Sequence, residues 1–299
     1  MSRRRVRREP FPPDRGLQVR MVLTAIGTPL LVVACLVALV AVAPTKILIG
    51  VAIAAVIGIV GSVRERAERP EPRVVGPEDE PVLHGIVDRL CVMADLPRPE
   101  IVVEDEREPN SWLVGLRRGR SRLYVTRGLV DLLEPAELEA VVAHELAHLA
   151  HRDAAVMTAV GGPGAVLLGG GRRMHGGWIW MSFGFWVAAG IGWLSRVGTQ
   201  TLSRYRELAA DAGAASLTGH PAALATALRK VAGQLRVVPR EDLRVAAARD
   251  AFNLLPVERP MEGWRGRMLG THPPLELRIA RLERLEQALQ RSRLADPLA

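Results

Sequence analysis

The chain has 299 residues, with 40 Lys and Arg against 32 Asp and Glu and a formal net charge of +8. Apolar residues make up 48% of the sequence, which is enough to bury a core and excludes an intrinsically disordered chain. Two cysteines exclude a disulfide scaffold and a cysteine-rich zinc module. Uncharged stretches alternate with arginine-rich ones, so the chain is not a uniformly soluble globule.

The N-terminal quarter has the pattern of a membrane anchor. Residues 1–20 contain seven arginines and are interpreted as a basic cytoplasmic tail, which assigns the positive charge to membrane orientation rather than to nucleic acid. Residues 21–45 are uncharged, and 47–63 add another uncharged run, so 21–64 is predicted to be a transmembrane hairpin. A cleaved signal peptide would have a shorter apolar core with no second span directly after it. Both ends of the hairpin are expected in the cytoplasm.

Two further uncharged stretches, 154–171 and 174–195, predict an apolar hairpin over 154–198 with a possible third and fourth membrane segment. The first is rich in glycine, so a span, a re-entrant hairpin and a buried core helix all remain open. The second carries four tryptophans, which are typical of membrane interfaces, and it favours insertion.

The polar segments 65–153 and 199–299 are predicted to fold together as an α+β domain that is mainly helical. Helices are expected at 82–94, from Pro135 to about Arg152, at 201–217 and from Pro273 onward. A short strand is expected at 101–103, and strands 111–116 and 122–126 should pair in a small antiparallel sheet. Segment 236–270 is interpreted as a loop region.

The chemistry is indicated by His144-Glu145-Leu146-Ala147-His148, inside the helix that starts at Pro135. Residues four apart on a helix differ by about 40° in direction, so both imidazoles face one point and can bind Zn²⁺. Glu145 then lies beside the ion, where a general base can take a proton from water. Two surface histidines would be the alternative, but apolar residues surround the trio, and buried polar groups need partners.

A catalytic zinc ion needs a third protein ligand. Glu207 is the preferred candidate, and Asp211 shares its helix face, where it could hydrogen-bond a ligand imidazole. An ordinary solvated helix pair is the alternative for these two carboxylates, and His151 is the alternative third ligand.

With these motifs the chain resembles the HtpX-like membrane zinc metallopeptidases, which are gluzincin-type proteases. The matching features are the two leading apolar spans, Pro109-Asn110-Ser111-Trp112, the motif from His144 to His148, the run from Ser203 to Gly213, and Thr271-His272-Pro273-Pro274 with Arg278. The resemblance implies a zincin-like fold whose two parts are 65–153 and 199–299. It implies that His144, His148 and Glu207 bind one Zn²⁺ per chain, with Glu145 as the catalytic base and Asp211 behind a ligand.

The expected function is a membrane-anchored zinc endopeptidase of the bacterial inner membrane, with several spans and its protease domain in the cytoplasm. Its expected partners are the lipid bilayer and protein substrates, and the resemblance implies quality control of damaged membrane proteins. His272 is a candidate oxyanion donor and Asn110 a candidate for binding substrate backbone, with a helix-start and a turn residue as their alternatives. The rival functions are an inactive membrane scaffold with a structural zinc site and a peripheral binding protein that is only anchored by 21–63.

Overall fold

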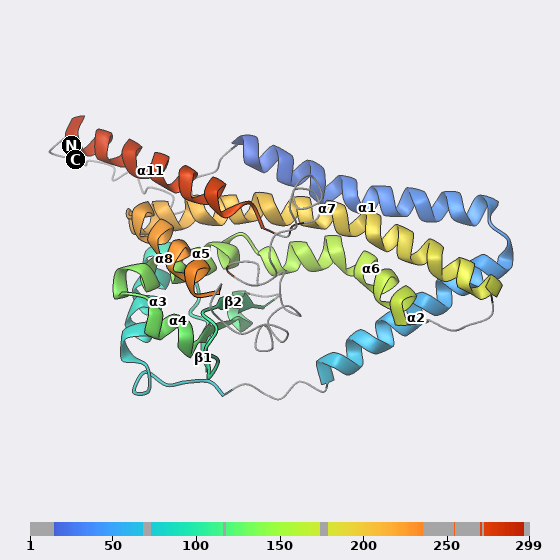
Figure 1. Cartoon of the computed structure of the whole chain (residues 1–299), viewed down its shortest axis with the longest axis horizontal. Coiled ribbons are helices and arrows are strands. Elements are labelled where there is room, and N and C mark those ends of the chain that lie inside the picture. Colours follow the sequence, from blue (N-terminus) through green and yellow to red (C-terminus); the bar gives the residue numbers. More distant parts are fainter. Residues whose placement is uncertain are drawn as a thin grey trace, which may run out of the picture. The chain divides into compact units, whose positions relative to one another are not determined.

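The computed structural model describes residues 15–67, 73–115, 118–173, 179–235 and 272–295, together with 254 and 270. The described elements are, in order, α1 (Arg15–Val42), α2 (Thr45–Ala67), α3 (Pro81–Ala94), β1 (Glu100–Glu104), β2 (Ser111–Val114), β3 (Arg122–Thr126), α4 (Arg127–Leu132), α5 (Pro135–Ala150), α6 (Asp153–Arg173), α7 (Ile179–Thr218), α8 (Pro221–Leu235) and α11 (Leu275–Ala295) (Figure 1). The predicted fold class, mainly helical with one small sheet, is confirmed. The chain divides into a strand-containing unit, Arg73–Ala154 with the chain from Arg204 onward, and a helical unit, Val19–Pro72 with Ala155–Ser203.

The three strands form a mixed sheet in the order β1-β3-β2. β2 runs antiparallel to β3, with Ser111 opposite Val125, as the sequence predicts. β1 runs parallel to β3, with Glu100 opposite Arg122, so the expectation of an antiparallel sheet throughout was wrong. The reason is that the chain passes from β1 to the far side of β3 before it turns back. This order leaves β2 at an edge of the described sheet.

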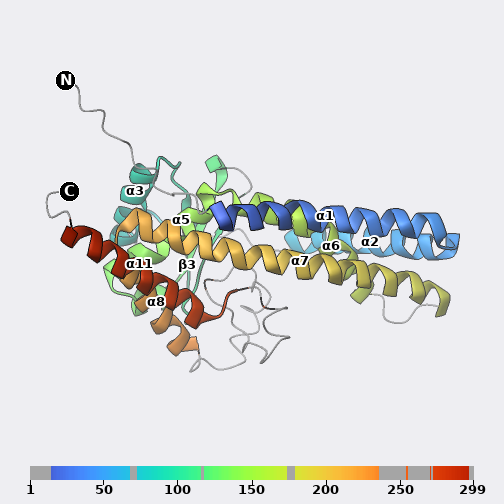
Figure 2. The same ribbon diagram turned by 90° about the horizontal axis from the view of Figure 1, so that it is seen from above.

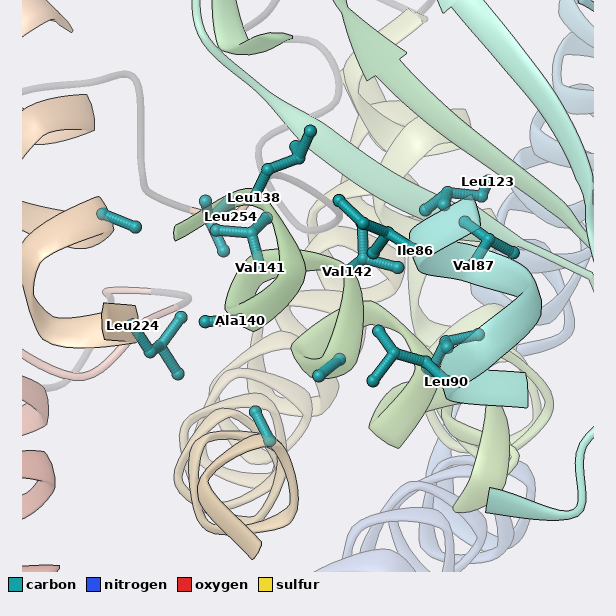
Figure 3. Packing of buried hydrophobic residues seen from close by; sticks show 14 of the residues in the cluster. Ile86, Val87, Leu90, Leu123, Leu138, Ala140, Val141, Val142, Leu224 and Leu254 are labelled. Atoms are coloured by element: carbon teal, nitrogen blue, oxygen red, sulfur yellow. The ribbon is translucent and has the colours of Figure 1, made fainter. Parts of the chain in front are cut away.

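Helix α5 lies at the centre of the core of the strand-containing unit. It starts at Pro135, whose fixed φ suits the first helical position, and the Glu137 carboxylate accepts the Glu134 backbone N–H at 2.9 Å. Figure 3 shows side chains of α3, β3, α5 and α8 meeting in one apolar cluster. Because apolar neighbours surround α5, its polar residues are held on a fixed support.

Two helices of this unit were not expected from the sequence. α4 follows β3 directly, and Thr126 caps it by accepting the Leu129 N–H at 3.3 Å. α8 packs against both α5 and α11. Its signal was present, because Pro221 opens it and the buried residues Leu224, Leu228 and Val231 recur at helical spacing.

The helical unit contains α1, α2, most of α6 and the first part of α7 (Figure 2). Glycines make the close contacts. A Cβ at Gly58 of α2 would overlap the backbone of α6, and a Cβ at Gly170 of α6 would overlap the backbone of α2. A Cβ at Gly198 of α7 would overlap the Thr28 side chain of α1. Small residues let membrane helices approach closely, so this packing suits a bundle in lipid. The expected helix over 201–217 is the end of α7, which is continuous with the apolar stretch before it.

Two described helices contain stretches long and apolar enough to cross a membrane, namely Gln18–Val42 and Thr45–Arg64. They cover the residues of the predicted hairpin, and side chains such as Leu23 and Val40 are more than 60% exposed. α6 and α7 do not reach this standard within their described residues, so the third and fourth spans stay a prediction. Residues 1–14 and 174–178, on which part of the basic tail and Trp178 fall, lie outside the described residues.

Candidate metal centre

Helix α5 brings the polar residues of the motif together, one helical turn apart. The rings of His144 and His148 meet edge to face with centroids 4.7 Å apart, and their Nε2 atoms are 3.1 Å apart. His144 and Glu145 are 1% and 3% exposed, so neither is a surface group. The two Nε2 atoms therefore point at one another in a place that is buried on the His144 side and partly buried on the His148 side, an arrangement that favours a shared partner.

Glu207 of α7 completes the cluster. Its Oε2 lies 3.6 Å from His144 Nε2, and its Oε1 lies 3.4 Å from His148 Nε2. Ligands about 2.0–2.1 Å from a tetrahedral ion are about 3.3–3.4 Å from one another, which is close to all three separations. Glu207 Oε2 is also buried; it accepts no hydrogen bond from a described residue, and Arg278 Nη1 lies 3.3 Å from it as an ion-pair partner. The donor set and its spacing fit a zinc ion, and His151 does not belong to this group of the described residues.

Behind His144 lies a buried carboxylate that is itself paired. His144 Nδ1 is 3.0 Å from Asp211 Oδ1, on the side of the ring away from Nε2. Arg278 of α11 donates to both oxygens of Asp211, at 2.8 and 2.7 Å. Because a carboxylate next to Nδ1 keeps a proton there, Nε2 is left as the nitrogen that can bind a metal.

A second carboxylate stands behind His148 in the same way. Asp153 Oδ2 is 2.6 Å from His148 Nδ1, and the other oxygen of Asp153 forms an ion pair with Arg206 of α7. Arg152 has a positive φ of 57°, a conformation that interrupts the helix between α5 and α6, so that α6 starts at Asp153. Each of the two histidines is thus backed by a buried aspartate, and each aspartate by a buried arginine.

The pKa values of the two glutamates of the site are shifted in opposite directions. Burial raises the pKa of Glu145, and the nearby His144 and His148 only partly offset this. Burial would also raise the pKa of Glu207, but His272 and the two ring nitrogens outweigh it and hold that pKa well below its usual range. An ionised Glu207 suits a ligand, and a Glu145 that binds protons more readily suits a base.

A residue of the sheet forms a hydrogen bond with Glu145. Ser111, the first residue of β2, donates its hydroxyl to Glu145 Oε1 at 2.8 Å. The next residue, Trp112, does not face this site, because it stacks on Tyr124 of β3 with centroids 5.0 Å apart. The bulk of Trp112 is therefore taken up by packing against a neighbouring strand.

Asn110, the candidate for binding substrate backbone, and His272, the candidate oxyanion donor, are both buried. They are 5% and 7% exposed. The side-chain oxygen of Asn110 accepts the Leu254 N–H at 3.2 Å, and its backbone N–H donates to Thr126 Oγ1 at 2.8 Å. Asn110 thus anchors its own surroundings. His272 is close enough to Glu207 for its charge to lower the pKa of that carboxyl.

Sequence reasoning did not assign site roles to Ser111, Asp153, Arg206 or Arg278. Asp153 had a usable signal, since it follows His148 by five residues at the start of an uncharged run. Arg206 was read as part of a solvated helix surface, and Arg278 was a matching feature of the resemblance that was given only a structural role; their burial, 3% and 0% exposed, was not predicted.

Comparison with known proteins identifies the family. The model of peptidase family M48 matches residues 77–286, which is more than half of the chain. The chain belongs to peptidase family M48. As an M48 member with two apolar helices it is a membrane metalloprotease.

Two curated relatives agree with this M48 assignment over 73% or more of the chain. Protease HtpX homolog 1 of Streptomyces coelicolor is 41% identical over 292 residues, covering 93% of this chain and 96% of the relative. Protease HtpX homolog 2 of Methanosarcina mazei is 39% identical over 230 residues, covering 73% and 76%. The crystal structure of S. mikatae Ste24p shares the fold at a TM-score of 0.50, with 17% identity and 90% and 67% of the two chains covered. The resemblance to HtpX-like proteases is confirmed.

Proposed function

We propose that the chain is a zinc-dependent endopeptidase in which His144, His148 and Glu207 hold one Zn²⁺ and Glu145 is the general base. The observation that carries the proposal is the cluster of three ligand atoms within 4.8 Å of one another, directly beside a buried carboxylate from the same turn of α5. A bound zinc ion would supply Lewis-acid polarisation of a peptide carbonyl and would acidify water at the site.

The residues of the chain then carry out the proton transfers. Glu145 takes a proton from the attacking water and returns it to the leaving amine, and its raised pKa suits both steps. His272 is the proposed donor to the oxyanion, since it is buried and close to Glu207. Asn110 is proposed to bind substrate backbone next to β2.

The substrate is proposed to bind as an added strand. Among the described strands β2 pairs with β3 alone, so its other edge can offer backbone N–H and C=O groups to an extended peptide. Because β2 begins at Ser111, which touches Glu145, a peptide lying along this edge would pass the proposed base.

The proposed setting is a multi-pass protein of the bacterial inner membrane with its protease unit in the cytoplasm. Arg15 precedes the first apolar stretch, Arg20 lies close to its start, and Arg64 ends the second, so both ends of the hairpin carry positive charge. Membrane-embedded or membrane-near proteins, damaged ones included, are the proposed substrates. Reporter fusions after Arg64 test the orientation. Activity of a fused reporter that functions only outside the cytoplasm would contradict it.

The catalytic proposal is tested with Glu145→Gln in detergent with added zinc, using casein as an unfolded substrate. The variant should keep about one zinc per chain and lose cleavage, because an amide cannot accept the proton. Glu139→Gln is the matched control, since Glu139 also lies on α5 but pairs with Arg89 at its surface at 2.8 Å. Cleavage by the Glu145→Gln protein would contradict the role of the base.

Metal content separates this proposal from the rival scaffold. Glu207→Ala should lose most of its zinc affinity, and full metal content in that variant would remove Glu207 from the ligand set. A folded wild-type protein that binds zinc but cleaves neither casein nor membrane proteins would favour a structural zinc site. The buried Glu145 argues against that rival, because a structural site has no use for a base.

A further inference from the structure

We infer that Ser111 is a positioning residue for Glu145, and that its hydroxyl fixes the orientation of the carboxylate that acts as base. The inference rests on the proposed role of Glu145. It adds a residue of β2 to the catalytic apparatus and connects the base to the strand along which the substrate is proposed to bind.

The contact is short and buried. Ser111 Oγ lies 2.8 Å from Glu145 Oε1, and the two residues are 1% and 3% exposed. A hydroxyl that donates to an ionised carboxylate forms one of the stronger hydrogen bonds in proteins, and low local polarity strengthens it further. The bond is therefore able to hold the carboxylate in one rotation.

The register of β2 directs Ser111 toward α5. Alternate residues of a strand face the same side of a sheet, so Ser111 and Leu113 share a face. Leu113 belongs to the core cluster that surrounds α5, whereas Trp112, between them, stacks on Tyr124. A shift of the strand by one residue would turn Ser111 away from Glu145.

The chemical consequence concerns the end of the Glu145 side chain. The carboxyl group rotates about a torsion with broad minima, so burial alone does not set which oxygen faces the reacting water. With Oε1 occupied by Ser111, Oε2 is the oxygen left to exchange the proton. An ordered base loses less time in unproductive orientations, so the benefit should appear in kcat rather than in KM.

A double-mutant cycle in the full chain separates this role from ordinary packing. Ser111→Ala should lower kcat by about ten-fold to a hundred-fold, the usual worth of a hydrogen bond to a charged group, with KM and zinc content unchanged. In a Glu145→Asp background, where the shortened side chain no longer reaches Ser111, the same change should lower kcat by about two-fold at most. Equal losses in both backgrounds would overturn the inference.

Two more variants keep the test sound. Ser111→Cys fills the same space with a weak donor, so it should lose kcat while keeping the melting temperature, even where the alanine variant is poorly folded. Ser121→Ala is the matched control, because it removes another buried serine hydroxyl next to the opposite end of β3, and it should keep its kcat. Full activity in Ser111→Cys and Ser111→Ala would refute the role.

The outcomes also distinguish the inference from the proposed function. If Glu145→Gln is inactive while Ser111→Ala cleaves at the wild-type rate, Glu145 remains the base and the role of Ser111 is wrong. If Glu145→Gln still cleaves, the proposed base is wrong and the inference falls with it. A Ser111→Ala protein with raised KM and unchanged kcat would assign Ser111 to substrate docking and overturn the positioning role.

Discussion

Arg278 should be the most costly single charge to remove from the strand-containing unit. Its guanidinium is 0% exposed, pairs with both oxygens of Asp211, and donates to the Leu254 carbonyl at 2.9 Å. Burial would lower the pKa of this guanidinium, but Asp211 and Glu207 outweigh it and raise the pKa, so Arg278 stays charged. Arg278→Met keeps much of the volume and leaves two buried carboxylates without their cation.

Breaking a buried ion pair by removing one partner costs about 3–5 kcal/mol. In a unit of this size that corresponds to a fall in melting temperature of about 6–20 °C. The matched control is Arg229→Met, because Arg229 also pairs with a carboxylate of α11, Glu283, but both side chains are about half exposed. Pairs of that kind contribute about 0–1 kcal/mol, so the control should melt close to the wild type.

The assay is thermal unfolding of the full chain in detergent at neutral pH, followed by circular dichroism, with zinc content measured on the same samples. Adding Asp211→Asn to Arg278→Met should recover part of the lost stability, because the second change removes one of the two uncompensated charges. The reasoning is refuted if Arg278→Met melts within error of Arg229→Met, or if the double variant loses the sum of both single losses.

Three further predictions concern other parts of the chain. Asp153→Asn should weaken zinc binding about ten-fold to a hundred-fold in a competition titration, because it removes the carboxylate at 2.6 Å from His148 Nδ1; unchanged affinity would exclude that role. Gly170→Ala should destabilise the protein in detergent, since a Cβ there would overlap the α2 backbone, whereas Gly162→Ala meets nothing within 4 Å and should not. Burial raises the pKa of Cys91 to about 11, so at about pH 8 roughly one thiol in a thousand is ionised. In a variant that lacks the other cysteine, alkylation of Cys91 should therefore be slow until the protein unfolds. Rapid labelling of the native form would contradict this.

Much of the fold could be predicted from the sequence because its signals are local. The apolar runs that became α1 and α2 needed only length and absence of charge, and α5 needed Pro135 and an apolar periodicity. The parallel pairing of β1 with β3 was missed because strand order depends on contacts between distant segments. The continuity of α7 was missed because the end of the apolar stretch predicted a boundary between 198 and 199, although one helix can contain both apolar and charged stretches.

In the candidate site, too, residues that are close in sequence were predicted more readily than those that distant segments bring together. His144, Glu145 and His148 are close in sequence, so helix geometry alone places them together. Ser111 was not assigned a role because the pairing of β2 and its approach to α5 set its direction, and a serine in an alternating strand has no chemical signal of its own. The pairing of each aspartate with an arginine was likewise not predicted, because only the folded chain shows that these cations are buried beside them.

The pairing of carboxylates with arginines behind the two histidines has a consequence for charge neutrality. Among the described residues, the buried carboxylates and guanidinium groups around His144 and His148 are those of Glu145, Asp153, Glu207, Asp211, Arg206 and Arg278. With His144 and His148 neutral, these four acids and two bases leave a formal surplus of two negative charges, which the proposed divalent cation and His272 beside Glu207 would offset. Chelation would therefore strip the counter-charge from a water-poor interior, and proton uptake or local opening would have to replace it. If the proposed site holds its ion, loading of that ion would be a step in folding of the protease unit as well as a requirement for the proposed chemistry.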